Sequence, residues 1–402
     1  MSAPTGYSIA SYVSSIDDSV QPFALWVPRT YHARKAYPLL VTLHGSDADH
    51  RMIPEQCWRI QERGFREDII LLSPFGRGEV GYRWMGEADI WDAMNEVKLR
   101  YRIDARRQYL TGLSMGGYAA WRLACEYPEQ WAAIAPVCGG GDVAALKALK
   151  SVPVWCVHGE NDDIVPVNRS RELIAELKRL KYRHRYDELK HTGHHSWEWL
   201  YNPNRRDDTL VDWLLKFRKG SAPAPVVQPR RQGVLKDLFL ERVIISYPAD
   251  TPVPREVELL RAEAERIAQF HFGDCEMRSG RLLVKTDREL TPADLRSANH
   301  LMLGRSDNHA ILKQAERRLL ARHARGQLRV DGEAYLGKTL VAATVQRSPW
   351  NAARLLGIIT YQQFRQMRGI AQVLFDYASE PFAVNVYDAL QKRFIRQAVV
   401  RV

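Results

Sequence analysis

The sequence predicts an α/β protein in which a mostly parallel sheet is covered by helices on both faces, followed by a smaller α/β domain. In the first 220 residues, short apolar runs alternate with segments in which apolar residues recur at helical spacing. Strands that alternate with helices in this way form parallel sheets with two buried faces. A segment rich in Pro and Ala, residues 219–233, then separates a second part with apolar runs of its own.

The first part contains six apolar runs that have the length of buried strands. They are FALWV from Phe23, YPLLVTL from Tyr37, DIILLS from Asp68, QYLTGLS from Gln108, AAIAPVC from Ala132 and PVWCVHG from Pro153. The segment RHRYDEL from Arg183 is expected to add an edge strand. Helices are expected at residues 87–101 and 168–181, because apolar residues share one helical face in each.

The second part also mixes strands and helices. Strands are expected at residues 242–247, 299–304 and 353–361. One helix is expected at residues 254–270, with a proline near its start, and another at residues 364–377. The length of 402 residues is sufficient for two domains that each bury a core.

The basic charge of the chain is concentrated in this second part. Residues 1–220 hold 30 Lys and Arg against 28 Asp and Glu, whereas residues 221–402 hold 28 against 19. We therefore predict a domain at 1–220, a linker at 221–233 and a small basic domain of unknown role at 234–402. No aromatic-interleaved basic motif accompanies the charge, so no nucleic-acid partner is expected.

The five cysteines are odd in number, widely spaced and form no CxxC pair. This pattern favours free thiols in a reducing compartment. No apolar run reaches the length of a membrane span, so no membrane partner is expected. The start of the chain lacks the features of a secretion signal, which favours a cytoplasmic location. A secreted or periplasmic location would require a signal that was removed, and the oligomeric state is left open.

The segment GLSMGG, residues 112–117, contains the pattern G-x-S-x-G between an expected strand and an expected helix. This pattern places a serine on a sharp, strained turn, where its hydroxyl is exposed above the sheet. Gly112 and Gly116 are explained by the turn, because side chains at those positions would collide with neighbouring backbone. We predict Ser114 as a nucleophile.

The acid and the base that serve such a nucleophile are expected in the order Ser, Asp, His. Asp162 follows a strand end, the usual position of catalytic groups in an open α/β sheet, and its neighbour Asp163 is the alternative. The base is expected from the loop that holds His191, His194 and His195. No cysteine pair or spaced carboxylate joins these histidines in a ligand pattern, so neither a metal nor a cofactor is predicted.

A tetrahedral intermediate on Ser114 needs two backbone N–H donors for its oxyanion. One is expected from Met115, directly after the nucleophile, and the other from Ser46 in the loop HGSDAD. His44, Trp84 and Trp197 are candidates for the substrate-lining wall, since aromatic groups suit a sugar or an aryl ring. For the tryptophans, ordinary packing under a loop is an equal alternative.

These residues carry a resemblance to a known group of enzymes. The matching segments are QPFALWVPRTY, YPLLVTLHGS, SPFGRGEVGYRWMGEADIWDAM, YRIDARRQYLTGLSMGGYAAWRLACEYPEQWAAIAPVCGG, HGENDDIVPV and GHHSW. From about Tyr7 to Lys219 the chain resembles the α/β-hydrolase family of feruloyl esterases, polyhydroxybutyrate depolymerases and prolyl-oligopeptidase-like serine peptidases. The resemblance implies the α/β-hydrolase fold and places the base on His194, with His195 as the alternative, and the acid on Asp162. The second part is similar to a C-terminal domain attached to some bacterial members.

The expected function is that of a serine hydrolase with a Ser-His-Asp triad and an acyl-enzyme intermediate. The substrate is expected to be a carboxylic ester with a short acyl or an aryl, feruloyl-type group, either a small molecule or attached to a polymer. The alternative is a prolyl-oligopeptidase-like serine peptidase or amidase, because the same triad cleaves esters and amides.

Overall fold

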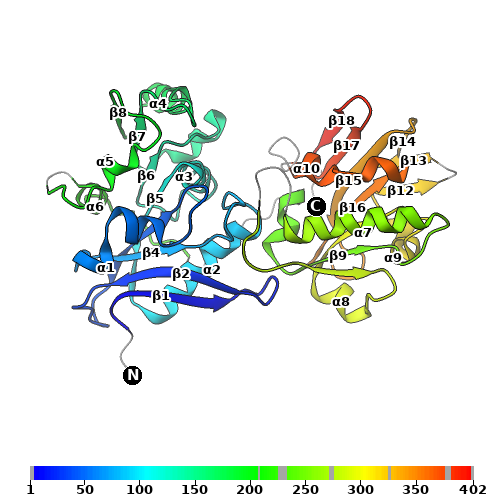
Figure 1. Cartoon of the computed structure of the whole chain (residues 1–402), viewed down its shortest axis with the longest axis horizontal. Helices are drawn as coiled ribbons and strands as arrows, with labels where there is room; N and C mark the ends of the chain where they lie inside the picture. Colours follow the sequence, from blue (N-terminus) through cyan, green and yellow to red (C-terminus); the bar gives the residue numbers. More distant parts are fainter. Residues whose placement is uncertain are drawn as a thin grey trace. The chain divides into compact units, whose positions relative to one another are not determined.

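The computed structural model describes residues 4–206, 209–224, 233–270, 276–324, 327–375 and 382–399. They form two compact units (Figure 1). The second unit contains the C-terminal part together with Val13–Ser19 and Arg83–Ala88, and the first contains most of the N-terminal part. Residues 225–232 of the predicted linker lie outside the described residues. No helix in the described ranges is long and apolar enough to cross a membrane.

The first unit is built on an eight-stranded sheet with the order β1-β2-β4-β3-β5-β6-β7-β8. Its strands are β1 (Gly6–Val13), β2 (Val20–Val27), β3 (Tyr37–Leu43), β4 (Ile70–Pro74), β5 (Ile103–Leu113), β6 (Ala133–Val137), β7 (Val154–Gly159) and β8 (His184–Leu189). Strand β2 pairs antiparallel with β4, and the pairs from β4 through β8 are parallel. Seven of the strands coincide with predicted segments, and this order is that of the α/β-hydrolase fold, as predicted.

Helices and short helical segments, the latter written η, connect these strands. They are η1 (Met52–Cys57), α1 (Ile60–Arg63), α2 (Met85–Arg100), α3 (Met115–Glu126), η2 (Val143–Leu149), α4 (Asn168–Arg179), α5 (Trp197–Leu200) and α6 (Leu210–Leu215). The predicted helices at 87–101 and 168–181 correspond to α2 and α4.

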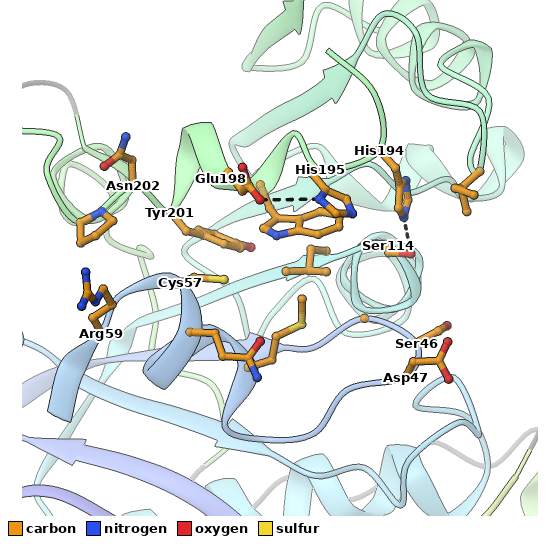
Figure 2. Close-up of a pocket in the computed structure, with 17 residues that line it drawn as sticks. Ser46, Asp47, Cys57, Arg59, Ser114, His194, His195, Glu198, Tyr201 and Asn202 are labelled. Atoms are coloured by element: carbon orange, nitrogen blue, oxygen red, sulfur yellow. Dashed lines mark hydrogen bonds and ion pairs between the residues drawn. The ribbon is translucent and has the colours of Figure 1, made fainter. Parts of the chain in front are cut away.

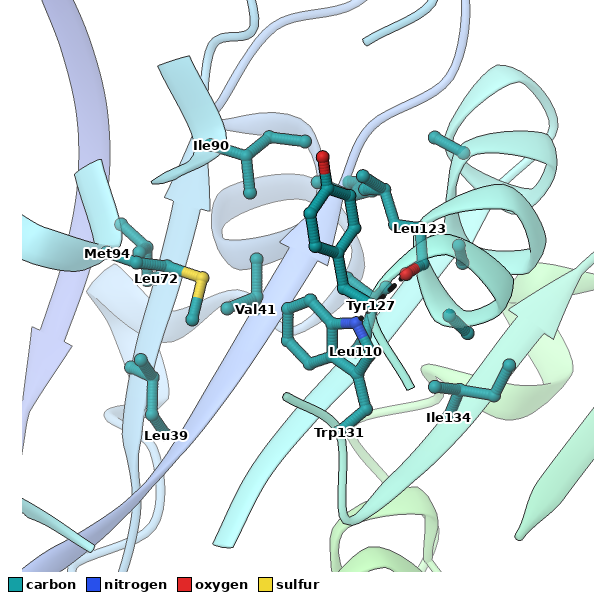
Figure 3. Packing of buried hydrophobic residues seen from close by; sticks show 14 of the residues in the cluster. Leu39, Val41, Leu72, Ile90, Met94, Leu110, Leu123, Tyr127, Trp131 and Ile134 are labelled. Carbon is teal, nitrogen blue, oxygen red and sulfur yellow. Dashed lines mark hydrogen bonds between the residues drawn. The ribbon is translucent and has the colours of Figure 1, made fainter. Parts of the chain in front are cut away.

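Both faces of the first sheet are buried, which explains why its strands are continuous apolar runs. On one face, Met94 of α2 and Leu123 of α3 belong to the same core cluster as Leu110 of β5 (Figure 3). In this cluster the indole N–H of Trp131 donates to the carbonyl of Leu123 at 3.4 Å. The other face is covered by residues of α5 and α6. The strands are therefore held rigidly, and their carboxyl ends form a fixed platform for functional groups.

The second unit has a seven-stranded sheet with the order β10-β9-β11-β16-β15-β17-β18 and a separate three-stranded sheet β12-β13-β14. The strands are β9 (Val243–Tyr247), β10 (Leu283–Thr286), β11 (Asn299–Leu303), β12 (Ala321–Ala324), β13 (Gln327–Val330), β14 (Glu333–Tyr335), β15 (Leu340–Arg347), β16 (Leu355–Tyr361), β17 (Val384–Asp388) and β18 (Arg393–Ala398). Strands β10, β9, β11 and β16 are parallel, whereas β15, β17 and β18 are antiparallel.

The helical segments of this unit are η3 (Leu235–Leu240), α7 (Pro254–Gln269), α8 (Pro292–Ser297), α9 (Ala310–Ala315), η4 (Glu316–Arg318), η5 (Phe364–Met367) and α10 (Ile370–Leu374). The prediction of a single helix at residues 364–377 was wrong. It is divided into η5 and α10 at Gly369, whose positive φ of 70° breaks the helical path. Residues 376 and 377 of that prediction lie outside the described ranges.

Candidate active site

Ser114 stands on a sharp turn between β5 and α3. Its backbone has φ 53° and ψ −117°, a strained combination for a residue with a side chain. The N–H of Ser114 donates to the carbonyl of Val137 on the neighbouring strand at 3.0 Å, which holds the turn in place. The structure therefore puts Ser114 at the carboxyl edge of the sheet, in the strand-turn-helix context that the motif requires.

The glycines around Ser114 are required by close packing of the backbone. A Cβ atom at Gly116 would overlap the carbonyl oxygen of Leu43 on β3, and one at Gly112 would overlap the carbonyl oxygen of Gly116. Both obstacles are main-chain atoms, so neither can rotate away. The turn beneath Ser114 can form only with glycine at these two positions.

Ser114, His194 and Asp162 form one hydrogen-bonded chain. The Nε2 atom of His194 lies 3.0 Å from the Ser114 Oγ, and its Nδ1 atom lies 2.8 Å from the Asp162 Oδ2. The Asp162 side chain is fully buried, and its Oδ1 accepts the N–H groups of Ile164 and Val165 at 3.0 and 2.8 Å. An anionic carboxylate held by fixed N–H donors keeps the imidazole in one orientation.

His158, at the end of β7, is a residue of this site that sequence reasoning missed. Its Nε2 atom lies 3.1 Å from the Asp162 Oδ2 and 2.9 Å from the carbonyl of Val165, and both neighbours are acceptors. Its Nδ1 atom lies 2.7 Å from the hydroxyl of Ser170. Burial lowers the pKa of His158. A neutral ring that carries its proton on Nε2 and accepts from Ser170 satisfies all three contacts.

Cys138, directly after β6, lies beside the same hydrogen-bonded chain. Its Sγ atom and one ligand atom each of Asp162 and His194 lie within 4.8 Å of one another. Burial raises the pKa of the Cys138 thiol to about 12, so the sulfur stays protonated. Because the thiolate is the metal-binding form, and Asp162 and His194 already bond to each other, the trio fits hydrogen bonding rather than ion binding.

A pocket of about 800 Å³ opens above Ser114 and His194. Figure 2 shows Ser114, His194 and Ser46 at one end of it, and Arg59 and Asn202 at the other. A pocket of this size is sufficient for a small organic ligand. A substrate bound along it would therefore place one end at the serine hydroxyl and the other near the Arg59 guanidinium.

The wall between these two ends comes from an unusual backbone segment. Met52, Gln56 and Cys57 of η1, a short π-helix, line the pocket. Arg59 follows in the left-handed region with φ 53°, which costs about 1–2 kcal/mol for a residue with a side chain. π-helical segments and strained residues both occur preferentially at functional sites. Sequence reasoning missed this wall, because no motif marks a π-helix.

Of the two residues expected to donate to an oxyanion, Ser46 lines the serine end of the pocket, and Met115, directly after Ser114, is not among its lining residues (Figure 2). Met115 is the first residue of α3, where the backbone N–H groups have no partner within the helix. Gly45 precedes Ser46, and a Cβ atom there would approach the Leu113 Cδ1 to 2.8 Å. Glycine at position 45 thus lets this loop approach the elbow closely.

Of the three residues expected at the substrate wall, one lines this pocket. Trp197 lines the pocket, and its ring meets that of His194 edge-on at 5.3 Å between centroids. His44 does not line it: the side chain is buried, with its ring nitrogens 2.8 and 2.9 Å from the carbonyls of Gly45 and Phe75.

Trp84 does not line the pocket either. It is buried in the second unit, with its ring 4.8 Å from that of Phe270 and 6.3 Å from that of Phe375. Its neighbour Arg83 lies over the Trp84 ring and donates to the carbonyl of Phe375 at 3.1 Å. The aromatic bulk of Trp84 thus serves packing and not a substrate wall.

The alternative acid and bases lie apart from this hydrogen-bonded chain. Asp163 and His191 are exposed. His195 is exposed by 71%, and its Nδ1 atom lies 3.6 Å from a carboxylate oxygen of Glu198. It lines the pocket without contacting Ser114. Of the three histidines, the structure brings His194 to the serine hydroxyl.

Comparison with known proteins gives relatives for part of the chain. No family model matches. A bifunctional acetylxylan esterase/xylanase of Neocallimastix patriciarum is 32% identical over 134 residues, which are 32% of this chain and 20% of that protein. A probable feruloyl esterase C of Aspergillus niger is 26% identical over 157 residues, which are 38% of this chain and 58% of that protein.

A solved structure of a thermostable esterase matches 53% of this chain and 63% of its own chain, with 27% identity and a TM-score of 0.46. The matched regions span 20% and 58% of the length of the two curated relatives. The predicted resemblance to feruloyl esterases is confirmed by these relatives, and the strand order of the first sheet is that of their expected fold. This chain is thus similar to esterases of the feruloyl and acetylxylan type, on an α/β-hydrolase fold.

Proposed function

We propose that the chain is a serine hydrolase that cleaves carboxylic esters, and that residues 1–220 form its catalytic domain. The observation that carries the proposal is the chain of hydrogen bonds from Asp162 through His194 to Ser114, which ends at the floor of a pocket. Similarity to acetylxylan and feruloyl esterases supports ester hydrolysis.

In the proposed reaction, the Ser114 Oγ attacks the ester carbonyl while His194 Nε2 takes its proton. The carbonyl π electrons move onto oxygen, and Ser46 and Met115 donate their N–H groups to the oxyanion. When the intermediate collapses, the bond to the alcohol oxygen breaks, and His194 returns the proton to that oxygen. Asp162 stabilises the imidazolium that exists between the two transfers.

The acyl group then remains on Ser114 as an ester. A water molecule gives a proton to His194 and attacks the acyl carbon, and collapse of the second intermediate releases the acid and restores the serine hydroxyl. Both steps use the N–H groups of Ser46 and Met115 for the oxyanion and His194 as the base. No group beyond water and the ester is consumed.

We propose a short acyl or aryl ester as the substrate, either free or attached to a polymer. Trp197 and Met52 offer apolar contact, Gln56 offers a polar contact, and Arg59 and Asn202 offer polar contacts at the far end of the pocket (Figure 2). A flat, apolar group with a polar substituent is the chemistry that such walls bind.

The free thiols at Cys57, Cys125, Cys138 and Cys156 support a reducing compartment.

Covalent labelling tests the nucleophile. A fluorophosphonate is expected to add one phosphonyl group per chain, located on Ser114 by peptide mass analysis. Ser114→Ala should abolish both the adduct and the turnover of p-nitrophenyl acetate, whereas Ser151→Ala, at an exposed serine, should change neither. Labelling of another residue, or turnover by Ser114→Ala, would contradict the proposal.

A substrate panel distinguishes the ester from the amide alternative. Short-chain p-nitrophenyl esters and methyl ferulate are expected to be turned over, and aminoacyl-p-nitroanilides much more slowly. Rapid anilide cleavage together with negligible ester cleavage would favour the peptidase alternative and overturn ester hydrolysis.

A further inference from the structure

A second groove lies in the second unit, apart from the proposed catalytic residues. It has a volume of about 640 Å³ and runs between α7 and η5. Arg255, Glu258 and Leu259 line it from one face of α7, and Phe364, Arg365 and Arg368 line it from η5 and the residue after it. With Ala262 of α7, seven described residues line the groove, and three of them are arginines.

Among the described residues, the three arginines have no acidic partner. Within the described part of the chain, no ion pair or side-chain hydrogen bond engages the guanidinium groups of Arg255, Arg365 or Arg368. Other arginines of the same unit are paired, such as Arg354 with Glu241 at 2.6 Å and Arg396 with Asp331 at 2.9 Å. Fifteen donor N–H groups at about five per guanidinium are therefore available to a ligand at this groove.

The charge of Arg255 is also unfavourable with respect to the dipole of its own helix. It lies in the first turn of α7, which begins at Pro254. The start of a helix carries partial positive charge, so a cation there is unfavourable by about 0.3–1 kcal/mol. A bound anion at this position would be attracted both by the Arg255 guanidinium and by the partial positive charge of the helix start.

The groove begins at the edge of the sheet where ligands of such folds bind. Strand β9 ends at Tyr247 just before α7, and β16 ends at Tyr361 just before η5. These strands are parallel to β10 and β11, so their carboxyl ends lie at the same edge. Strands β10 and β11 lie on opposite sides of β9, which makes a topological switch point there.

From these observations we infer that the groove between α7 and η5 binds a small polyanion through its phosphate or carboxylate oxygens. Arginine supplies planar, bidentate donors that suit both groups, and no lysine is among the described residues that line the groove. Phe364 and Leu259 are half-buried and offer apolar contact to the body of the ligand. Glu258, the single acid of the wall, would accept from a ligand hydroxyl.

Calorimetric titration of the full chain with inorganic pyrophosphate, and separately with citrate, tests the inference. The double variant Arg365→Gln/Arg368→Gln is expected to weaken binding at least about tenfold, because it removes two bidentate donors. The matched control Arg296→Gln/Arg317→Gln loses the same charge at exposed arginines of the same unit outside the groove. It should change the dissociation constant less than about twofold.

The two anions distinguish the ligand groups. Binding of pyrophosphate alone would assign a phosphate ligand, and tighter binding of citrate would assign a carboxylate. If the intact chain binds neither anion, or if both double variants weaken binding equally, the groove is not a site and the inference is overturned. Thermal unfolding of each variant verifies that the fold is retained, and the proposed esterase activity plays no part in the measurement.

Discussion

The Nε2 atom of His158 lies 3.1 Å from the same Oδ2 oxygen of Asp162 that accepts from His194. One carboxylate oxygen thus joins the proposed catalytic base to a second, fully buried histidine. The second histidine is anchored in turn by Ser170. His158 is therefore placed to position Asp162, and through it His194, without contacting the substrate.

We predict that His158→Leu lowers kcat by up to about 100-fold and leaves KM nearly unchanged. The substitution removes a donor to Asp162, so the carboxylate and His194 lose their fixed orientation, and small misplacements of catalytic groups have effects of this size. His158→Gln, which retains an N–H donor, should recover part of the loss. Steady-state kinetics on p-nitrophenyl acetate checks both variants. If His158→Leu lowers both the melting temperature and the fraction of chains that fluorophosphonate labels, the role of His158 is purely structural.

The two adjacent histidines give a second prediction. His194→Ala should reduce kcat for ester hydrolysis by at least about 1,000-fold, because the proposed general base is lost. His195→Ala should keep kcat within about threefold, because its ring is exposed and pairs weakly with Glu198. Measuring the two variants side by side assigns the base. Loss of activity in His195→Ala alone would refute the role of His194.

Local patterns in the sequence were sufficient to predict the elements that lead to the site. The elbow at Ser114 is visible because the motif, the strand and the helix lie next to one another in the chain. The N-terminal strand β1 was missed, because none of its residues is buried and the pattern alternates only between half-buried and exposed positions. The break at Gly369 was missed because a single glycine inside an apolar pattern is also compatible with a continuous helix.

Long-range packing decided the residues that could not be predicted. In the sequence, His158 is part of an apolar run at the end of a strand, and only the folded chain brings it to Asp162. The opposite holds for Trp84, which lies between the oxyanion loop and the elbow in sequence, yet its ring packs against Phe270. Neither contact produces a pattern of residues at a fixed spacing, so a single sequence cannot reveal it.

The close packing at Gly116 predicts loss of the site upon a one-carbon change. In Gly116→Ala, the added methyl group would overlap the carbonyl oxygen of Leu43, so the turn that presents Ser114 must shift. We expect destabilisation of about 2 kcal/mol or more and the loss of fluorophosphonate labelling. Gly220→Ala is the matched control, because nothing lies within 4 Å of its Cβ position. Chemical denaturation and labelling measure both, and wild-type behaviour of Gly116→Ala would contradict the packing argument.

Buried histidines of the second unit predict sensitivity to acid. Burial lowers the pKa values of His309 and His323 to about 4, below the value of about 6.5 in an unfolded chain. Between these values the unfolded chain binds more protons. The stabilising contribution is therefore complete above pH 6.5 and is lost as the pH falls toward 4, by about 1.4 kcal/mol per pH unit for each histidine.

His309→Asn tests this pH dependence. Asparagine can replace the histidine as the residue that caps α9 and accepts from Leu312, but it does not titrate. Denaturant unfolding between pH 4 and pH 7 should show a smaller slope against pH in this variant than in the wild type. Identical slopes for the variant and the wild type would exclude the contribution of His309.

The strained backbone at Arg59 predicts that stability and substrate binding change in opposite directions. Arg59→Gly removes the cost of the left-handed conformation and should raise the free energy of unfolding by about 1 kcal/mol. Its ion pair with Glu62 is exposed, so little is lost with it. Because the guanidinium lies at the far end of the pocket from Ser114, KM for methyl ferulate should rise several-fold, while kcat for p-nitrophenyl acetate stays unchanged. Lys392→Gly, at another positive φ, should gain similar stability and leave both kinetic constants unaltered. If Arg59→Gly is stabilised but binds methyl ferulate as the wild type does, Arg59 is not part of the substrate site.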